Sequence, residues 1–258
     1  MKIGIISVPF ERNQGAFLQS YALIKALENM GHYAELIDYK VSEAKRKKLQ
    51  FKRIFGITPR RFILSIKSRK VFRETWSTLP CSKHWSEVHL YDGYILGSDE
   101  IWNYQSPTIG YSPLRFGFGL PKGKVVAYAP SFGPVSLENG IRTEVVENIK
   151  QIEYVSARDY NTKAIVEFLT GKSVPIVLDP TFLVDLLSLK KNIEHNKYIL
   201  IYGHFERKEV CDILEYSKKE GKQLISLYGF YNSWCDLNIV ADPFELLGYF
   251  SFADEVIT

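Results

Sequence analysis

The sequence has 258 residues, of which 46% are hydrophobic and 24% are charged; these values are ordinary for a folded globular protein and exclude an intrinsically disordered chain. Its three cysteines (Cys81, Cys211 and Cys235) lie far apart and form no CxxC pair, so neither a disulfide framework nor a zinc site is indicated. No signal peptide and no run of roughly 20 apolar residues for a membrane span is present, and we therefore expect a cytoplasmic protein.

The net charge of +4 is unevenly distributed along the chain. Residues 40–73 hold 13 Lys and Arg against one acid, Glu43, which makes this basic stretch +12 and the remainder −8. A solvated helical insertion explains such a stretch, and so does a surface that attracts an anionic membrane. We keep both interpretations and expect no nucleic-acid partner.

The first 40 residues predict a βαβ unit. Residues 2–8 are a short apolar run typical of a buried parallel strand, residues 16–30 place apolar side chains at helical spacing, and residues 33–39 predict a second strand. A strand, a helix and a strand at this spacing indicate a parallel, doubly wound α/β sheet. The basic stretch then predicts two amphipathic helices broken at Pro59. Further along, strands are predicted at 93–96, 125–129, 153–156 and 174–178, with helices at 141–149 and 160–169.

A polar segment at 186–196 separates this set from a second one. In the second set, strands are predicted at 198–202, 223–227, 238–240 and 255–258, with helices at 206–220 and 243–252. We predict an N-terminal Rossmann-like domain over 1–188, with a basic helical insertion at about 40–75, and the start of a C-terminal domain over 196–258. One face of the second sheet is left uncovered, so we expect that domain to be incomplete in this chain.

Open α/β sheets bind ligands outside the carboxyl ends of their strands, so the loops at those ends are the candidate sites. In the first, residues 13–16, Gly15 lets the backbone approach a ligand and the following helix offers N–H groups to an anion. The alternative is a glycine that the turn itself requires. The chain has no GxGxxG and no Walker lysine, so a dinucleotide site or a P-loop is not indicated.

The second loop, residues 97–103, combines acids, a hydroxyl, an amide and an indole directly after a strand. Asp99 suits hydrogen bonds to sugar hydroxyls, and Trp102 suits an apolar sugar face. The competing interpretation is a helix cap formed by Asp99 above a core tryptophan.

The third loop spans 128–133, and the fourth combines 156–159 with 178–181. Arg158 in the fourth loop can hold a carboxylate or phosphate with its planar guanidinium. It can equally pair with Asp159 or Asp179 as a structural contact. Among the histidines, His204 follows a predicted strand and is the one expected near a cleft.

In order and spacing, these segments resemble the polysaccharide pyruvyl transferase family. The resemblance rests on KIGIIS with RNQGAFLQSYAL and GHYAELIDY (2–39), DGYILGSDEIWN (92–103), VVAYAPSFG (125–133), YVSARDYNT (154–162) and VPIVLDPTFLV (174–184), with a weaker match in KYILIYGHF (197–205). Glu100, Pro130 and Asp159 stand where many members have other residues. A family motif of the Ser/Thr-x-His-Gly type is missing, which makes us expect a truncated chain.

The resemblance implies two Rossmann-like domains that face each other across a cleft, as in B-type glycosyltransferases. It also implies a transferase that moves the enolpyruvyl unit of phosphoenolpyruvate onto a sugar of a cell-surface polysaccharide or its lipid-linked precursor, forming a pyruvate ketal without a metal or organic cofactor. A lipid-linked acceptor would bring the protein to the inner membrane face. The alternatives are a nucleotide-sugar glycosyltransferase of similar architecture and a degenerate, non-catalytic binding protein.

From these loops and the resemblance we predict one set of substrate-binding residues: Asn13, Gly15, Gln19, Ser98, Asp99, Trp102, Ser131 and Arg158. The candidates for a catalytic residue are Asp99 and His204.

Overall fold

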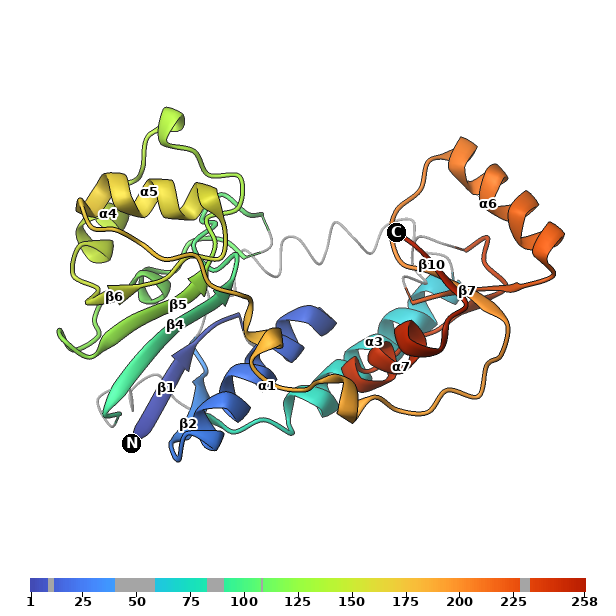
Figure 1. Ribbon diagram of the computed structural model, residues 1–258, viewed down its shortest axis with the longest axis horizontal. Coiled ribbons are helices and arrows are strands. Elements are labelled where there is room, and N and C mark those ends of the chain that lie inside the picture. The colour runs from blue at the N-terminus through green and yellow to red at the C-terminus, as the bar shows by residue number, and fades with distance from the viewer. Residues whose placement is uncertain (9–11, 40–58, 83–90, 108, 228–232) are drawn as a thin grey trace. The chain divides into compact units, whose positions relative to one another are not determined.

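A computed structural model describes residues 1–8, 12–39, 59–82, 91–107, 109–227 and 233–258 (Figure 1). The chain divides into two compact units. The first contains Met1–Lys52 and Trp76–Val184, and the second contains Arg53–Thr75 and Asp185–Thr258. The domain boundaries predicted from the sequence stay a prediction.

The first unit is built on a six-stranded parallel sheet in the order β3-β2-β1-β4-β5-β6. Its strands are β1 (Lys2–Ile6), β2 (Tyr33–Ile37), β3 (Cys81–Ser82), β4 (Gly93–Asp99), β5 (Val125–Pro130) and β6 (Tyr154–Val155). This is the strand order of doubly wound dinucleotide-binding folds, in which the chain reverses direction across the sheet between β1 and β4. The predicted parallel α/β class is confirmed.

Helices cover both sides of this sheet. α1 (Gln14–Asn29) lies on one side, and α4 (Thr143–Ile149) with α5 (Tyr160–Thr170) lies on the other (Figure 1). α1 begins where Asn13 accepts a hydrogen bond from the Ala16 amide, and it buries Phe17, Leu18 and Ile24. On the opposite side, Trp102, Phe116 and Phe132 pack into one buried cluster with apolar side chains of β4, α4 and α5.

The second unit contains a four-stranded parallel sheet in the order β10-β7-β8-β9. Its strands are β7 (Tyr198–Ile201), β8 (Gln223–Ser226), β9 (Leu237–Asn238) and β10 (Glu255–Ile257), and its helices are α6 (Arg207–Glu220) and α7 (Pro243–Phe252). α6 ends at Gly221, which has a φ of 63°. Asp242 and Glu245 form a capping box at the start of α7. Because strands and helices alternate along this unit, the predicted βα repeat is confirmed.

The basic stretch is described only in its second half. α3 (Pro59–Trp76) begins at the predicted break, Pro59, and belongs to the second unit except for Trp76. The other predicted amphipathic helix lies outside the described residues. No helix in the described part of the chain has both the length and the apolar character that a membrane crossing demands.

Two features of the first unit differ from prediction. The strand predicted at 174–178 is wrong, because its backbone pairs with the sheet at a single bridge, Ala157 with Ile176. Pro175 has no amide hydrogen for a ladder, so continued pairing there is disfavoured. β3, a two-residue edge strand, was not predicted because so short a segment carries no periodicity.

Candidate functional site

The first sheet has its topological switch point between β1 and β4, where loops leave in opposite directions and open a crevice for ligands. α1 follows β1, and Asp99 is the last residue of β4. The two loops that the sequence singled out first, 13–16 and 97–103, therefore leave neighbouring strands at this one edge. Strand order alone brings them together.

Asp179 joins side chains that come from three parts of the first unit. Its Oδ2 accepts hydrogen bonds from Gln19 Nε2 on α1 and from Arg158 Nη1, the latter at 3.1 Å. Its Oδ1 accepts from the Thr181 amide and hydroxyl, which fixes the carboxylate at the start of the 3-10 turn Pro180–Phe182. The structure thus confirms that the segments 156–159 and 178–181 meet.

Arg158 is also close to the end of β4, because its Nη2 lies 3.8 Å from Asp99 Oδ1. We call Gln19, Asp99, Arg158 and Asp179 the switch-point cluster. Arg158 pairs with two carboxylates in this cluster and not with Asp159, which instead caps α5 by accepting from the Thr162 amide at 2.7 Å. The cluster is about a quarter exposed or less at each of its three charged side chains.

Asp99 is held in an unusual conformation and environment. Its φ is 70°, in the left-handed region that L-residues other than glycine seldom adopt. The pKa of its carboxyl is raised above the ordinary value, chiefly by burial, although the hydrogen bond from the Glu100 amide and the charge of Arg158 act in the opposite direction. A strained carboxyl group that is driven toward its protonated form is typical of a functional position.

The neighbouring strand carries a second strained residue. Ala129 near the end of β5 has a φ of 52°, and Asp99 is registered against Pro130, the next residue. Such backbone conformations persist where surrounding contacts enforce them, and here the Ser131 amide donates to the Asp99 carbonyl at 2.9 Å. Two adjacent strand ends are therefore distorted next to the same cluster.

The predicted residues near α1 have distinct roles. Asn13 caps the helix through its side chain, Gly15 is exposed, and a Cβ on Gly15 would meet only Asn13 Oδ1 within 4 Å. That distance would be 3.2 Å, so the glycine leaves room for the capping side chain, and Gly15 itself is exposed. Gln19 is one turn further along and reaches Asp179.

Three predicted substrate-binding residues lie in the interior. Trp102 is 0% exposed, its ring stacks on Phe116 with centroids 6.0 Å apart, and its Nε1 donates to the Arg115 carbonyl at 2.8 Å. The prediction that its indole covers a sugar is wrong in this structure, because no face of the ring is exposed. Ser98 and Ser131 are also buried, at 1% and 4%, and the Ser131 hydroxyl accepts from the Gly133 amide at 3.0 Å.

His204 belongs to the second unit. It is exposed in the loop after β7, next to the place where the second sheet reverses between β7 and β10. By topology this loop corresponds to the loop between β1 and α1 in the first unit. This parallel between the two sheets keeps His204 as a candidate catalytic residue.

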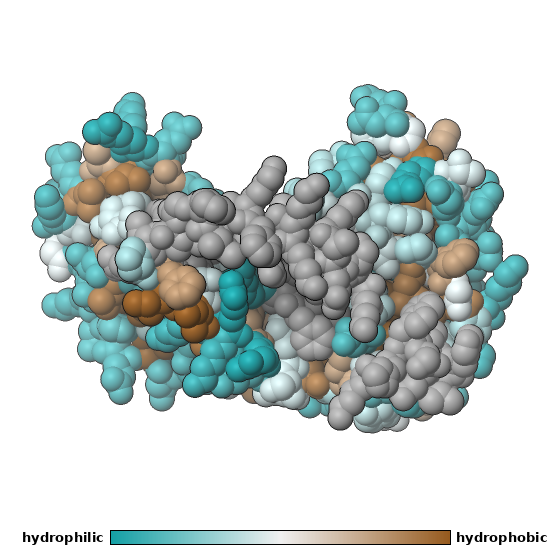
Figure 2. Space-filling model, turned by 180° about the vertical axis from the view of Figure 1, so that it is seen from behind, coloured by the Kyte–Doolittle hydropathy of each residue, from teal (hydrophilic) through white to brown (hydrophobic). Residues whose placement is uncertain are grey.

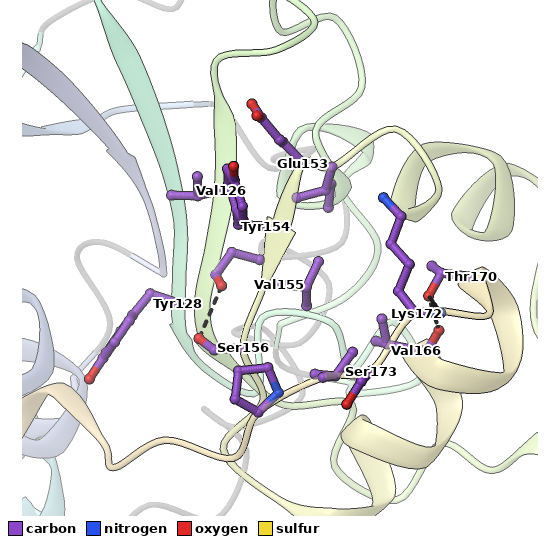
Figure 3. A pocket seen from close by; sticks show the side chains of 14 residues that line it. Val126, Tyr128, Glu153, Tyr154, Val155, Ser156, Val166, Thr170, Lys172 and Ser173 are labelled. Atoms are coloured by element: carbon purple, nitrogen blue, oxygen red, sulfur yellow. Dashed lines mark hydrogen bonds between the residues drawn. The ribbon is translucent and has the colours of Figure 1, made fainter.

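A pocket of about 480 Å³ lies at the open edge of the first sheet, beside β6 and α5 (Figure 3). Val126, Val155 and Val166 line it, while the Tyr128 side chain extends away from the rest and donates to the Leu178 carbonyl at 3.1 Å. The pocket forms where residues 174–178 leave the sheet. None of the four residues of the switch-point cluster lines it, so we centre the candidate site on the cluster, where the charged groups converge.

The sequence indicates Asp179 only as a structural partner of Arg158. Its role in joining α1 to the two strand ends depends on a contact between residues 160 positions apart, Gln19 and Asp179, for which local sequence carries no signal. Within the described ranges, no group of three or more His, Cys, Asp or Glu side chains is placed to hold a metal ion.

Comparison with known families gives one match. The family model described as polysaccharide pyruvyl transferase covers residues 13–258, which is most of the chain and includes every residue of the switch-point cluster. No curated protein matches the sequence.

Proposed function

The chain belongs to the polysaccharide pyruvyl transferase family, and on that premise we propose that it transfers the enolpyruvyl unit of phosphoenolpyruvate to a sugar. The acceptor is a polysaccharide unit or its lipid-linked precursor, and the product is a pyruvate ketal. The proposal places this reaction in the cytoplasm. The observation that carries it is the switch-point cluster, where a guanidinium and a raised-pKa carboxyl meet at the sheet edge used by ligands.

Arg158 is the proposed anchor for the donor. Its guanidinium can bind a carboxylate or phosphate through two parallel hydrogen bonds. The exposed residues Asn13 and Gly15, at the start of α1, supply backbone N–H groups for the other anionic end. Gln19 and Arg158 share Asp179, so α1 and the guanidinium are held in one hydrogen-bonded arrangement. This supports a donor site that spans the two.

Asp99 is the proposed general acid. Two carboxylates surround one guanidinium in the switch-point cluster, so an anion binds best when Asp99 is neutral. Burial already raises the pKa of Asp99, and a bound anion beside it raises the pKa further. Donor binding and protonation of Asp99 therefore reinforce each other, which is the state that acid catalysis needs.

The reaction balances with these groups. Asp99 gives its proton to C3 of the enol, the double-bond electrons form the new C–H bond, and C2 becomes electrophilic. One sugar hydroxyl adds to C2 while a base removes its proton and passes it to the Asp99 carboxylate, which restores the acid. A second hydroxyl forms the other C–O bond as the bond from C2 to the phosphate oxygen breaks, and its proton leaves with inorganic phosphate.

The second unit is the proposed source of the remaining contacts. We propose that it faces the first unit across a cleft, with the loop after β7 presenting His204 as the base for the sugar hydroxyl. The equivalent position of that loop in the second sheet supports this assignment. Changing His204 to Gln should then slow turnover and leave donor affinity intact.

Thermal-shift titration with phosphoenolpyruvate tests the proposal on the 258-residue chain. Replacing Arg158 by Ala should weaken donor binding by about 1.5–3 kcal/mol, the scale of a hydrogen bond to a charged group, while Arg207→Ala on the exposed side of α6 should not. If a nucleotide sugar stabilises the protein and phosphoenolpyruvate does not, the chain acts as a glycosyltransferase instead. Stabilisation by a glycan alone would indicate a non-catalytic binding protein.

A further inference from the structure

The outward face of α3 combines large apolar side chains with cations. Three apolar residues in its first half are more than half exposed: Phe62 at 55%, Ile63 at 65% and Ile66 at 52%. Four cations in its second half are exposed as well: Lys67, Arg69, Lys70 and Arg73. Residues three and four apart share one side of a helix, so Phe62, Ile66, Lys70 and Arg73 fall on one face.

The inward face of α3 already has its own large apolar side chains. Phe72 and Trp76 are buried at 5% and 1%, together with the small polar residues Ser68 and Thr75 at 5% and 9%. A helix whose only task is to cover a core keeps its large apolar residues on that inward face. Packing among the described residues therefore accounts for Phe72 and Trp76 and leaves the outward phenylalanine and two isoleucines of α3 unexplained.

The charge of this face indicates an anionic partner. Its four cations are opposed on the face by Glu74 alone, whose carboxylate lies 4.0 Å from Lys70 Nζ, so the face carries a net positive charge. Lys and Arg side chains on this mixed face can extend to lipid headgroups while the Phe and Ile side chains beside them enter the acyl boundary, which suits an anionic bilayer. On the surface seen from behind, most of the coloured residues are hydrophilic and hydrophobic residues lie among them in small groups (Figure 2).

We propose that this face of α3, formed by Phe62, Ile63, Ile66, Lys67, Arg69, Lys70 and Arg73, is a docking surface for an anionic lipid bilayer. The protein lies on the membrane through it. This inference stands on α3 alone and does not depend on the proposed reaction. Both the apolar and the cationic half contribute, so binding needs anionic lipid and weakens with salt.

Co-sedimentation with vesicles tests the docking surface. Wild-type protein should bind vesicles that contain about 30% phosphatidylglycerol at least tenfold more tightly than vesicles of phosphatidylcholine, and the preference should fall in 0.5 M salt. Replacing Phe62, Ile63 and Ile66 together by Ser should reduce binding about tenfold. A matched control replaces Tyr160 and Phe168, exposed apolar residues of α5, by Ser and should leave binding unchanged.

A second variant keeps the test decisive if the triple Ser variant fails to fold. Replacing Lys67, Arg69, Lys70 and Arg73 by Gln leaves the apolar residues in place and should remove the preference for anionic lipid. Equal vesicle binding by wild type and this variant overturns the proposal. Two other results would also overturn it. One is a wild-type dimer in sedimentation equilibrium that the triple Ser variant no longer forms, which would make the face a contact between two copies of the chain. The other is tighter binding to nucleic acid than to vesicles.

Discussion

Arg115 is buried to 1% exposure, and its Nε donates a 2.6 Å hydrogen bond to the hydroxyl of Tyr39. The same hydroxyl donates to the carbonyl of Ser7, just after β1. The other nitrogens of Arg115 donate to the carbonyls of Ile109 and Gly110. A buried cation is thus satisfied by neutral oxygens, and Tyr39 ties the loop around Arg115 to the carboxyl edge of the sheet.

Replacing Tyr39 by Phe should lower the free energy of unfolding by about 2 kcal/mol, because one nitrogen of a buried guanidinium loses its acceptor. Urea denaturation measures the change. Tyr33→Phe is the matched control, since Tyr33 is 51% exposed and water replaces its lost contact. A Tyr39→Phe protein as stable as the control would mean that Arg115 finds another acceptor.

Replacing Asp99 by Asn should stabilise the fold at neutral pH. Because burial raises the pKa of Asp99 above its ordinary value of 3.8, the stability that this group contributes is full below that value and is lost as the pH rises through the folded-state pKa. Asparagine stays neutral and tolerates the left-handed conformation. The variant should therefore melt higher than wild type at pH 7, with the difference vanishing below pH 3.8, and it should lose transfer activity.

Melting curves of both proteins across this pH range check the Asp99 prediction, with the exposed Asp212→Asn on α6 as the control. A variant that melts lower than wild type at pH 7 would show that the ion pair with Arg158 outweighs the cost of burying the carboxylate. The predicted outcome for Asp99→Asn, higher stability with lower activity, is the trade-off typical of functional residues.

Replacing Gly133 by Ala should destabilise the first unit for two separable reasons. Gly133 has a φ of 56°, and a Cβ there would lie 2.7 Å from Glu100 Oε2. Gly171 has a φ of 69° with nothing within 4 Å, so Gly171→Ala reports the backbone cost alone, about 1 kcal/mol. Gly133→Ala should cost about 1 kcal/mol more, because the Glu100 carboxylate must move away from its hydrogen bond with Asn103. Denaturant titrations give both values, and adding Glu100→Ala should remove most of the excess.

The three cysteines should react at very different rates. Burial raises the pKa of Cys81 and of Cys235 to about 12, so almost none of either thiol is ionised at pH 8, whereas Cys211 is exposed on α6. Native protein should consume one equivalent of a disulfide thiol reagent quickly, and denatured protein three. Cys211→Ser should abolish the fast phase. Rapid reaction of a second thiol would contradict the shielding of Cys81 in β3 or of Cys235 in the loop before β9.

Most of the helices and strands could be predicted from the local spacing of apolar residues. Strands and helices of both sheets were predicted from short apolar runs that alternate with helical spacing, because each element must bury one face and the spacing of apolar residues reveals that face. The predicted strand at 174–178 has the apolar residues of a strand, but Pro175 lacks the amide hydrogen that a ladder needs, and the segment pairs with the sheet at a single bridge. How far a segment pairs also depends on a partner distant in sequence, which local composition does not contain.

The candidate site divides in the same way. The sequence by itself indicated the loops at strand ends and placed Asp99 and Arg158 among the candidates. Polar residues that directly follow a buried strand can be recognised from the sequence alone. Only the tertiary structure decided that Trp102 faces the core and that Asp179 joins Gln19 to Arg158. The direction of a side chain in a loop and the meeting of residues 160 positions apart depend on how the whole sheet packs, and that packing is a property of no single segment.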